Sequence, residues 1–189
     1  MSGTRSYPKL YLIGDSLTQR AVPASYWAQE LQERYIRKCD IINRGFSGYT
    51  SRMLVQMLPE ILQQETFNST INIAVILIGS NDSVLPELDK RAVPVEEYGT
   101  NLNNLIGLCK QKFSTVVIVT LPPQDEVRWD EHSRTTKNIP GCLSNEHASH
   151  YADKCLEVAE KNSIECIDLY HNMMRTPDWK ELFFCDGIS

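Results

Sequence analysis

The sequence lacks the features that mark membrane, secreted and nucleic-acid-binding chains. Its longest apolar run, residues 73–78, is far shorter than the ~20 residues that cross a bilayer. Residues 1–9 are polar and have no apolar core of a signal peptide. Lysine and arginine (19) are scattered and are outnumbered by acidic residues (24), which disfavours nucleic acid and anionic membranes as partners. We expect no membrane insertion and, by default, a cytoplasmic protein.

The chain also lacks close pairs of cysteine. Its cysteines are widely spaced, without a CxxC motif or a histidine cluster at metal-ligand spacing, at positions Cys39, Cys109, Cys142, Cys155, Cys166 and Cys185. In a chain without a secretion signal this usage predicts reduced, mostly buried thiols. We therefore expect no disulfide framework, no metal site and no cofactor.

The pattern that is present alternates short apolar runs with longer amphipathic stretches. The runs predict strands at residues 10–13, 40–43, 71–78, 115–120 and 165–169. Apolar residues at helical spacing lie between them, around Trp27, Leu54, Leu102 and Ala148, with Pro59 as a predicted kink in the second helix or a junction of two short turns. Five such repeats in 189 residues predict a single α/β domain, 1–189, with a parallel sheet covered on both faces.

One stretch, residues 121–140, has no clear apolar periodicity. It carries two adjacent prolines, several charges and Trp129. At about 20 residues it exceeds the usual connection between elements. We interpret it as an irregular loop that lines a site.

Three chemically useful residues follow the first three predicted strands. Ser16 follows the first strand, Gly48 lies after the second, and Asn81 follows the third. Ligands bind at the carboxyl ends of strands in open α/β sheets. A hydroxyl nucleophile, a glycine N–H and a side-chain amide donor are what acyl transfer requires. Taken singly, each residue could belong to a plain turn or helix cap, but their order at successive strand ends favours a site.

At these motifs the sequence resembles the GDSL-type or SGNH hydrolases, and within them the isoamyl acetate-hydrolysing esterases. The motifs are Gly14-Asp15-Ser16-Leu17, Asn43-Arg44-Gly45-Phe46-Ser47-Gly48-Tyr49-Thr50-Ser51-Arg52, Gly79-Ser80-Asn81-Asp82 and Asp186-Gly187. The resemblance implies Ser16 as nucleophile and an oxyanion hole from the N–H groups of Ser16 and Gly48 and the amide of Asn81. It implies Asp186 as the residue that orients a catalytic histidine. The fold expected with it is a flavodoxin-like three-layer α/β/α sandwich, strand order 2-1-3-4-5, with the C-terminal helix missing.

The histidine that the resemblance requires three residues after Asp186 is absent, since that position is Ser189. A serine hydroxyl does not take up a proton near neutral pH and cannot act as the base. His171, three residues after Asp168, has the correct spacing, but it follows the fifth strand, three places from the first. His132, in the long segment 121–140, is a further alternative. His147 and His150 lie in a helical pattern and are interpreted as surface or packing residues.

The sequence thus predicts a serine ester hydrolase that acts on small acyl esters of the acetate type through an acyl-enzyme. Without the histidine we expect this chain to be nearly inactive, as a truncated or spliced product, as a pseudoenzyme that binds esters or partners, or as a weak catalyst with an oxyanion hole alone. The enzymatic alternative is an acyl-thioesterase or lysophospholipase of the same superfamily. The expected partner is a small-molecule ester. An exposed apolar patch left by the missing helix would favour a homo-oligomer.

Overall fold

The computed structural model describes residues 7–21, 27–65, 67 and 71–183. Its five strands, β1 (Lys9–Gly14), β2 (Asp40–Gly45), β3 (Asn72–Leu77), β4 (Thr115–Val119) and β5 (Glu165–Ile167), form one sheet. All neighbouring strands are parallel and their order is β2-β1-β3-β4-β5. The predicted fold class and strand order are confirmed.

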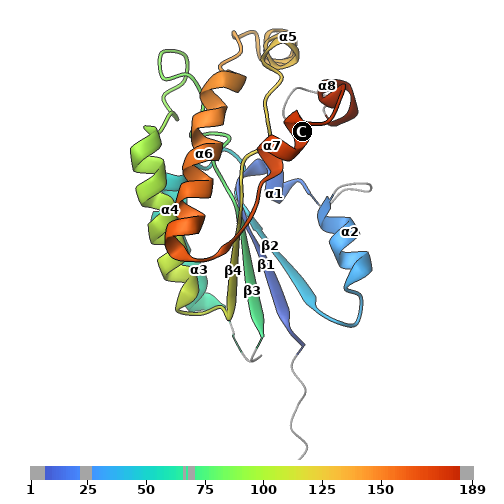
Figure 1. Ribbon diagram of the computed structural model, residues 1–189, viewed down its shortest axis with the longest axis vertical. Helices are drawn as coiled ribbons and strands as arrows, with labels where there is room; N and C mark the ends of the chain where they lie inside the picture. The colour runs from blue at the N-terminus through green and yellow to red at the C-terminus, as the bar shows by residue number, and fades with distance from the viewer. Residues whose placement is uncertain (1–6, 22–26, 66, 68–70, 184–189) are drawn as a thin grey trace, which may run out of the picture.

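The helices flank the sheet on both faces and gather at one of its ends. Their bounds are α1 (Ser16–Gln19), α2 (Trp27–Arg34), α3 (Ser51–Gln64), α4 (Val95–Lys110), α5 (Glu126–Lys137), α6 (Asn145–Asn162), α7 (Leu169–Met174) and α8 (Trp179–Phe183). Figure 1 shows α3, α4 and α6 on one side of the sheet and α2 on the other. Helix α3 runs through Pro59 as one helix. Within the described residues, no helix is long and apolar enough to cross a membrane.

The two faces of the sheet are buried to different degrees. Because side chains alternate along a strand, Ala74 and Ile76 of β3 face α3, α4 and α6 and are almost completely buried. Val75, on the other face, is only half-buried, and Ile167 of β5 is 52% exposed. The main core therefore lies between the sheet and α3, α4 and α6, and the second face is thinly covered.

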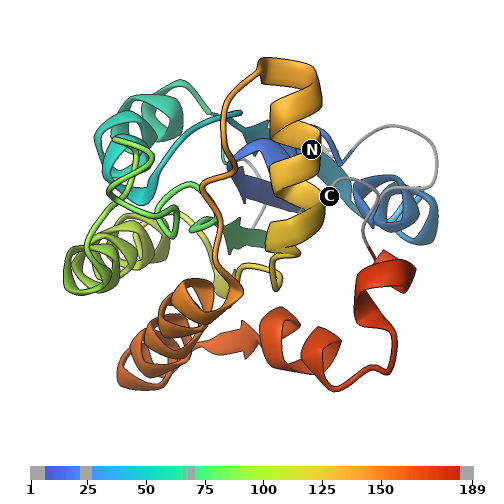
Figure 2. The same cartoon turned by 90° about the horizontal axis from the view of Figure 1, so that it is seen from above.

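The long segment 121–140 is not the irregular loop that the sequence predicts. Residues 126–137 form α5, whose first turn is capped by Asp125, since its side chain accepts a hydrogen bond from the Arg128 N–H. An ion pair between Arg134 and Asp130, one turn apart, supports the helix. Its N-cap and charge pairing, rather than an apolar face, define α5, so apolar periodicity could not reveal it. Helix α5 lies over the carboxyl ends of the strands (Figure 2).

A second correction concerns the end of β5. The sequence predicts a strand over residues 165–169, but β5 ends at Ile167. Asp168 caps α7, because its side chain accepts a hydrogen bond from the His171 N–H. Leu169 is therefore the first residue of a helix, and the chain turns away from the sheet two residues earlier than the apolar run suggests.

Candidate active site

Ser16 begins α1 directly after the central strand β1 and is half-buried. Asp15 caps this short helix, since its Oδ1 accepts a hydrogen bond from the Leu17 N–H at 3.0 Å. Gly14 permits a close approach of two strands, because a Cβ at this position would lie 2.0 Å from the backbone oxygen of Leu77. The Gly-Asp-Ser turn is thus fixed by packing against β3 and presents Ser16 at the carboxyl end of the sheet.

Gly48 lies in the turn after β2 with a φ of 82°. This left-handed conformation favours glycine. The reason is the backbone conformation and not a lack of space, because an added Cβ would meet no heavy atom within 4 Å. The turn is attached to the Ser16 segment by two hydrogen bonds. The Phe46 N–H donates to Gly14 O at 2.8 Å, and the Ser47 N–H donates to Gln19 Oε1 at 2.5 Å. The turn after β2 therefore lies beside the β1–α1 junction.

Asn81, 9% exposed, connects the turns after β2 and β3. Its Nδ2 donates a hydrogen bond to Tyr49 O at 2.9 Å, and its Oδ1 accepts one from Arg91 Nη1 at 2.7 Å. Among the described residues this uses one of the two N–H bonds of the amide. No described residue accepts a hydrogen bond from the other N–H.

The structure thus places Ser16, Gly48 and Asn81 after three adjacent strands, at one edge of the sheet. It brings Asn81 together with the Gly48–Tyr49 turn through the hydrogen bond to Tyr49 O. That all three donors reach one atom stays a prediction. Asp186 and Ser189 lie outside the described residues.

Two fully buried carboxyls, Asp15 and Asp82, belong to the same segments. Burial raises the pKa of Asp15 to about 7, the Leu17 N–H opposes this, and the charge of Asp82 adds to it. Burial also raises the pKa of Asp82 to about 6, against hydrogen bonds from Ser51. The Ser51 N–H lies 3.0 Å from Asp82 Oδ1, and Ser51 Oγ donates to the same atom at 2.5 Å. Asp82 therefore holds the Asn81 segment on the first turn of α3.

Among the described residues, no hydrogen bond joins Ser16 to either alternative histidine. His171 lies after β5, which β3 and β4 separate from β1. Its Nδ1 lies 2.9 Å from Asp168 Oδ1, and its Nε2 lies 3.4 Å from Asp153 Oδ1, so two carboxylates hold the ring. His132 belongs to α5 and stacks on Trp129, with 5.6 Å between ring centroids. In the described part of the chain, no three His, Cys, Asp or Glu side chains are grouped so that they could hold a metal ion.

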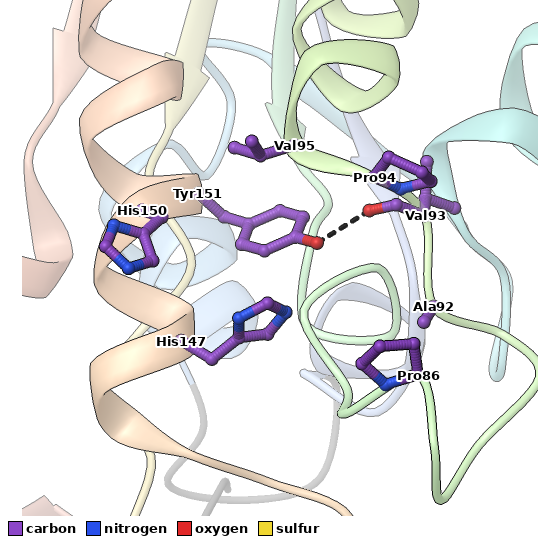
Figure 3. A pocket seen from close by; sticks show the side chains of 8 residues that line it. All are labelled: Pro86, Ala92, Val93, Pro94, Val95, His147, His150 and Tyr151. Carbon is purple, nitrogen blue, oxygen red and sulfur yellow. Dashed lines mark hydrogen bonds between the residues drawn. The ribbon is translucent and has the colours of Figure 1, made fainter.

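A cavity of about 310 Å³ lies between the segment 86–95 and α6. Its walls are mainly apolar, and they consist of Pro86, Ala92, Val93, Pro94, Val95, His147, His150 and Tyr151 (Figure 3). As the sequence predicts, His150 is exposed and His147 packs against Tyr151, and both also line this cavity. The Tyr151 hydroxyl donates to Val93 O at 2.6 Å and so attaches the segment to α6.

Comparison with known proteins agrees with this arrangement. Residues 12–188 match the model of the GDSL-like lipase/acylhydrolase family. This chain belongs to that family. It is 35% identical to the human isoamyl acetate-hydrolyzing esterase 1 homolog over 96% of this chain and 74% of the relative, and 31% identical to the mouse protein over the same shares. The family is named for lipases and acylhydrolases and these relatives for esterases, so the chain is a member of a family of ester hydrolases.

Solved structures show the same fold at lower identity. The lipase/acylhydrolase from Enterococcus faecalis superposes with a TM-score of 0.72 at 22% identity, over 96% of this chain and 86% of that one. An acetyl-xylooligosaccharide esterase from Geobacillus has a TM-score of 0.69 at 22% identity, over 95% and 85% of the two chains. This chain therefore shares its α/β/α fold with these two structures.

Proposed function

We propose that Ser16 is the nucleophile of a carboxylic-ester hydrolase that acts on small acyl esters, acetates of short alcohols in particular. The observation that carries this proposal is the amide of Asn81, which is fixed against the Gly48–Tyr49 turn with one N–H unused by the described residues. The acetate preference is supported by the names of a relative and a structural neighbour, an isoamyl acetate-hydrolyzing esterase homolog and an acetyl-xylooligosaccharide esterase.

In the proposed reaction Ser16 Oγ attacks the carbonyl carbon of the ester while its proton passes to a base. The carbonyl oxygen becomes negatively charged and accepts hydrogen bonds from the N–H groups of Ser16 and Gly48 and from the Asn81 amide. The bond to the alcohol oxygen then breaks, the alcohol leaves with the proton, and an acyl group stays on Ser16. Water attacks this acyl-enzyme, releases the carboxylic acid and restores the serine.

The base is the incomplete part of this site. Asp186 would orient an imidazole three residues later, where the chain has Ser189. A serine there neither deprotonates Ser16 nor protonates the leaving alcohol. We therefore propose that this sequence turns esters over slowly. The serine at position 189 also favours a second candidate function, that of a protein that binds esters without hydrolysing them.

Hydrolysis of p-nitrophenyl acetate and p-nitrophenyl palmitate by four proteins tests the proposal. They are the parent, Ser16→Ala as blank, Ser189→His, and Ser189→His with Ser16→Ala. We expect the parent to lie near the blank, and Ser189→His to raise acetate hydrolysis at least about tenfold in a Ser16-dependent manner, because a positioned base contributes about 100-fold or more. A faster rate on palmitate would favour a lysophospholipase-type enzyme. If Ser189→His stays at the blank, the binding function replaces the enzymatic one.

A cytoplasmic location belongs to the same proposal. It is supported by the thiols of the described cysteines, which are free at Cys39, Cys109, Cys142, Cys155 and Cys166. Free thiols are typical of reducing compartments. Fractionation of cells that express the tagged chain would test the location, and recovery in a secreted fraction would contradict it.

A further inference from the structure

The side-chain amide of Asn81 is held at both of its ends. Arg91 Nη1 donates to Asn81 Oδ1 at 2.7 Å, and Asn81 Nδ2 donates to Tyr49 O at 2.9 Å. If the amide were rotated by 180°, its NH₂ group would face the guanidinium donor and its oxygen would face the oxygen of Tyr49. Both contacts would then be repulsive. Arg91 and Tyr49 together therefore permit one orientation of the amide.

Arg91 is itself held in place by Asp89. The Asp89 carboxylate accepts from Arg91 Nη2 at 2.5 Å and from Nε at 3.1 Å, and it also accepts from the Arg91 backbone N–H at 2.9 Å. The guanidinium thus binds the Asp89 carboxylate through two nitrogens, Nε and Nη2. Its third nitrogen, Nη1, donates to Asn81. The same contact holds the pKa of Asp89 below its usual value, so both partners are charged at neutral pH.

The segment that carries Asp89 and Arg91 is fixed at its ends. The Val93 N–H donates to Asp82 O at 3.0 Å, which closes the segment on the residue next to Asn81. The Leu85 N–H donates to Cys142 O at 2.8 Å. The Tyr151 hydroxyl donates to Val93 O and so joins two residues that line the cavity (Figure 3). Arg91 therefore lies in a segment whose backbone is held by hydrogen bonds to the rest of the fold.

We propose that Arg91 is a positioning residue, which fixes and polarises the Asn81 amide for the oxyanion of the reaction. This inference rests on the proposed function, in which Asn81 is an oxyanion donor. A charge-assisted bond to Oδ1 draws electron density from the amide and makes its N–H groups stronger donors. An oxyanion hole is effective because its donors are oriented before charge develops. Arg91 acts through Asn81 and is not assigned a contact with the ester.

A measurement that does not require turnover tests the positioning. In ¹⁵N-labelled protein the two Nδ2 protons of Asn81 are identified by their loss in Asn81→Ala. We expect two well-separated, slowly exchanging signals in the parent and in Arg134→Ala, the matched control, because Arg134 forms an ion pair with Asp130 within α5 and, among the described residues, makes no hydrogen bond to Asn81 or Arg91. In Arg91→Met the signals should converge and exchange faster. In Arg91→Lys, which keeps a charged donor, the change should be smaller. Unchanged Asn81 signals in Arg91→Met would overturn the inference.

A double-mutant cycle tests the effect on catalysis in the Ser189→His background. We expect Arg91→Met to lower kcat about tenfold with little change in KM, a smaller loss than the ~100-fold or more typical of removing an oxyanion donor itself. In a protein that already carries Asn81→Ala, Arg91→Met should have no further effect, because Arg91 acts only through this amide. A merely structural role would lower kcat equally in both backgrounds and would contradict the inference.

The two experiments separate this inference from the function on which it rests. If Asn81→Ala leaves Ser16-dependent hydrolysis unchanged, the oxyanion role of Asn81 fails, and the catalytic part of this inference fails with it. If Asn81→Ala abolishes hydrolysis and Arg91→Met does not alter it, the proposed function stands and Arg91 has no positioning role. If Ser189→His gives no Ser16-dependent hydrolysis, the proposed function fails, and the amide signals alone decide whether Arg91 orients Asn81.

Discussion

Asp15, next to the candidate nucleophile, should make the stability of the protein depend on pH. The side chain is fully buried, and its pKa is raised by burial from 3.8 to about 7. A carboxyl of the unfolded chain keeps its ordinary pKa near 3.9. Between these two values the native protein holds a proton that the unfolded chain has released. Stability should therefore fall as pH rises from about 4 to about 7, since the unfolded state binds fewer protons.

The magnitude follows from the width of this interval. Full retention of one additional proton costs ~1.4 kcal/mol of stability for each pH unit. Over the interval from 3.8 to about 7 the loss therefore amounts to about 4 kcal/mol. Asp82 acts in the same direction, but its pKa is raised only to about 6. The window between pH 6 and pH 7 is therefore the one in which Asp15 dominates.

Asp15→Asn removes this titration and keeps a carbonyl oxygen that accepts the Leu17 N–H. We expect the variant to gain stability relative to the parent by ~1 kcal/mol between pH 6 and pH 7, because the carboxyl is half ionised at its pKa, and to show little further relative gain above pH 8. Urea unfolding followed by circular dichroism from pH 5 to pH 8.5 measures the difference. Asp40→Asn is the control, because Asp40 is exposed at the start of β2. A difference between parent and Asp15→Asn that does not vary with pH would refute the reasoning.

Three further predictions concern stability and assembly. Gly14→Ala should destabilise the protein by about 3 kcal/mol, because the new Cβ overlaps a backbone oxygen of β3; an unchanged urea midpoint would contradict it. Tyr151→Phe should cost about 1–3 kcal/mol, since it leaves the buried Val93 carbonyl without its partner, and a variant as stable as the parent would show that this bond contributes nothing. The half-covered sheet face around Val117 and Ile167 should promote self-association, which Ile167→Glu should reduce in a sedimentation series over concentration; identical profiles would exclude this face.

The sheet could be predicted from the sequence because its strands are simple apolar runs. Residues 73–78 form such a run, and the place of β3 in the centre of the sheet, between β1 and β4, follows from that composition. Helix α5 was missed for the opposite reason. Its residues are mostly polar, and it is specified by the Asp125 cap and a charged pair rather than by an apolar face. Patterns of hydrophobicity detect helices and strands that bury an apolar face. They do not detect a helix that is specified by its N-cap and by ion pairs.

In the candidate site, too, some residues could be predicted from the sequence and one could not. Ser16, Gly48 and Asn81 could be selected from the sequence because each lies within a few residues of the end of a strand, and parallel strands bring their carboxyl ends to one edge. Arg91 could not be selected, since ten residues separate it from Asn81 and no motif links the two. Its contact depends on where the segment after β3 returns, which the hydrogen bond from Val93 to Asp82 determines. Strand order therefore places the proposed nucleophile and oxyanion donors, whereas loop closure places Arg91, which we propose orients one of them. The Asn81→Ala and Arg91→Met cycle measures how much of the site's function resides in this second layer of contacts.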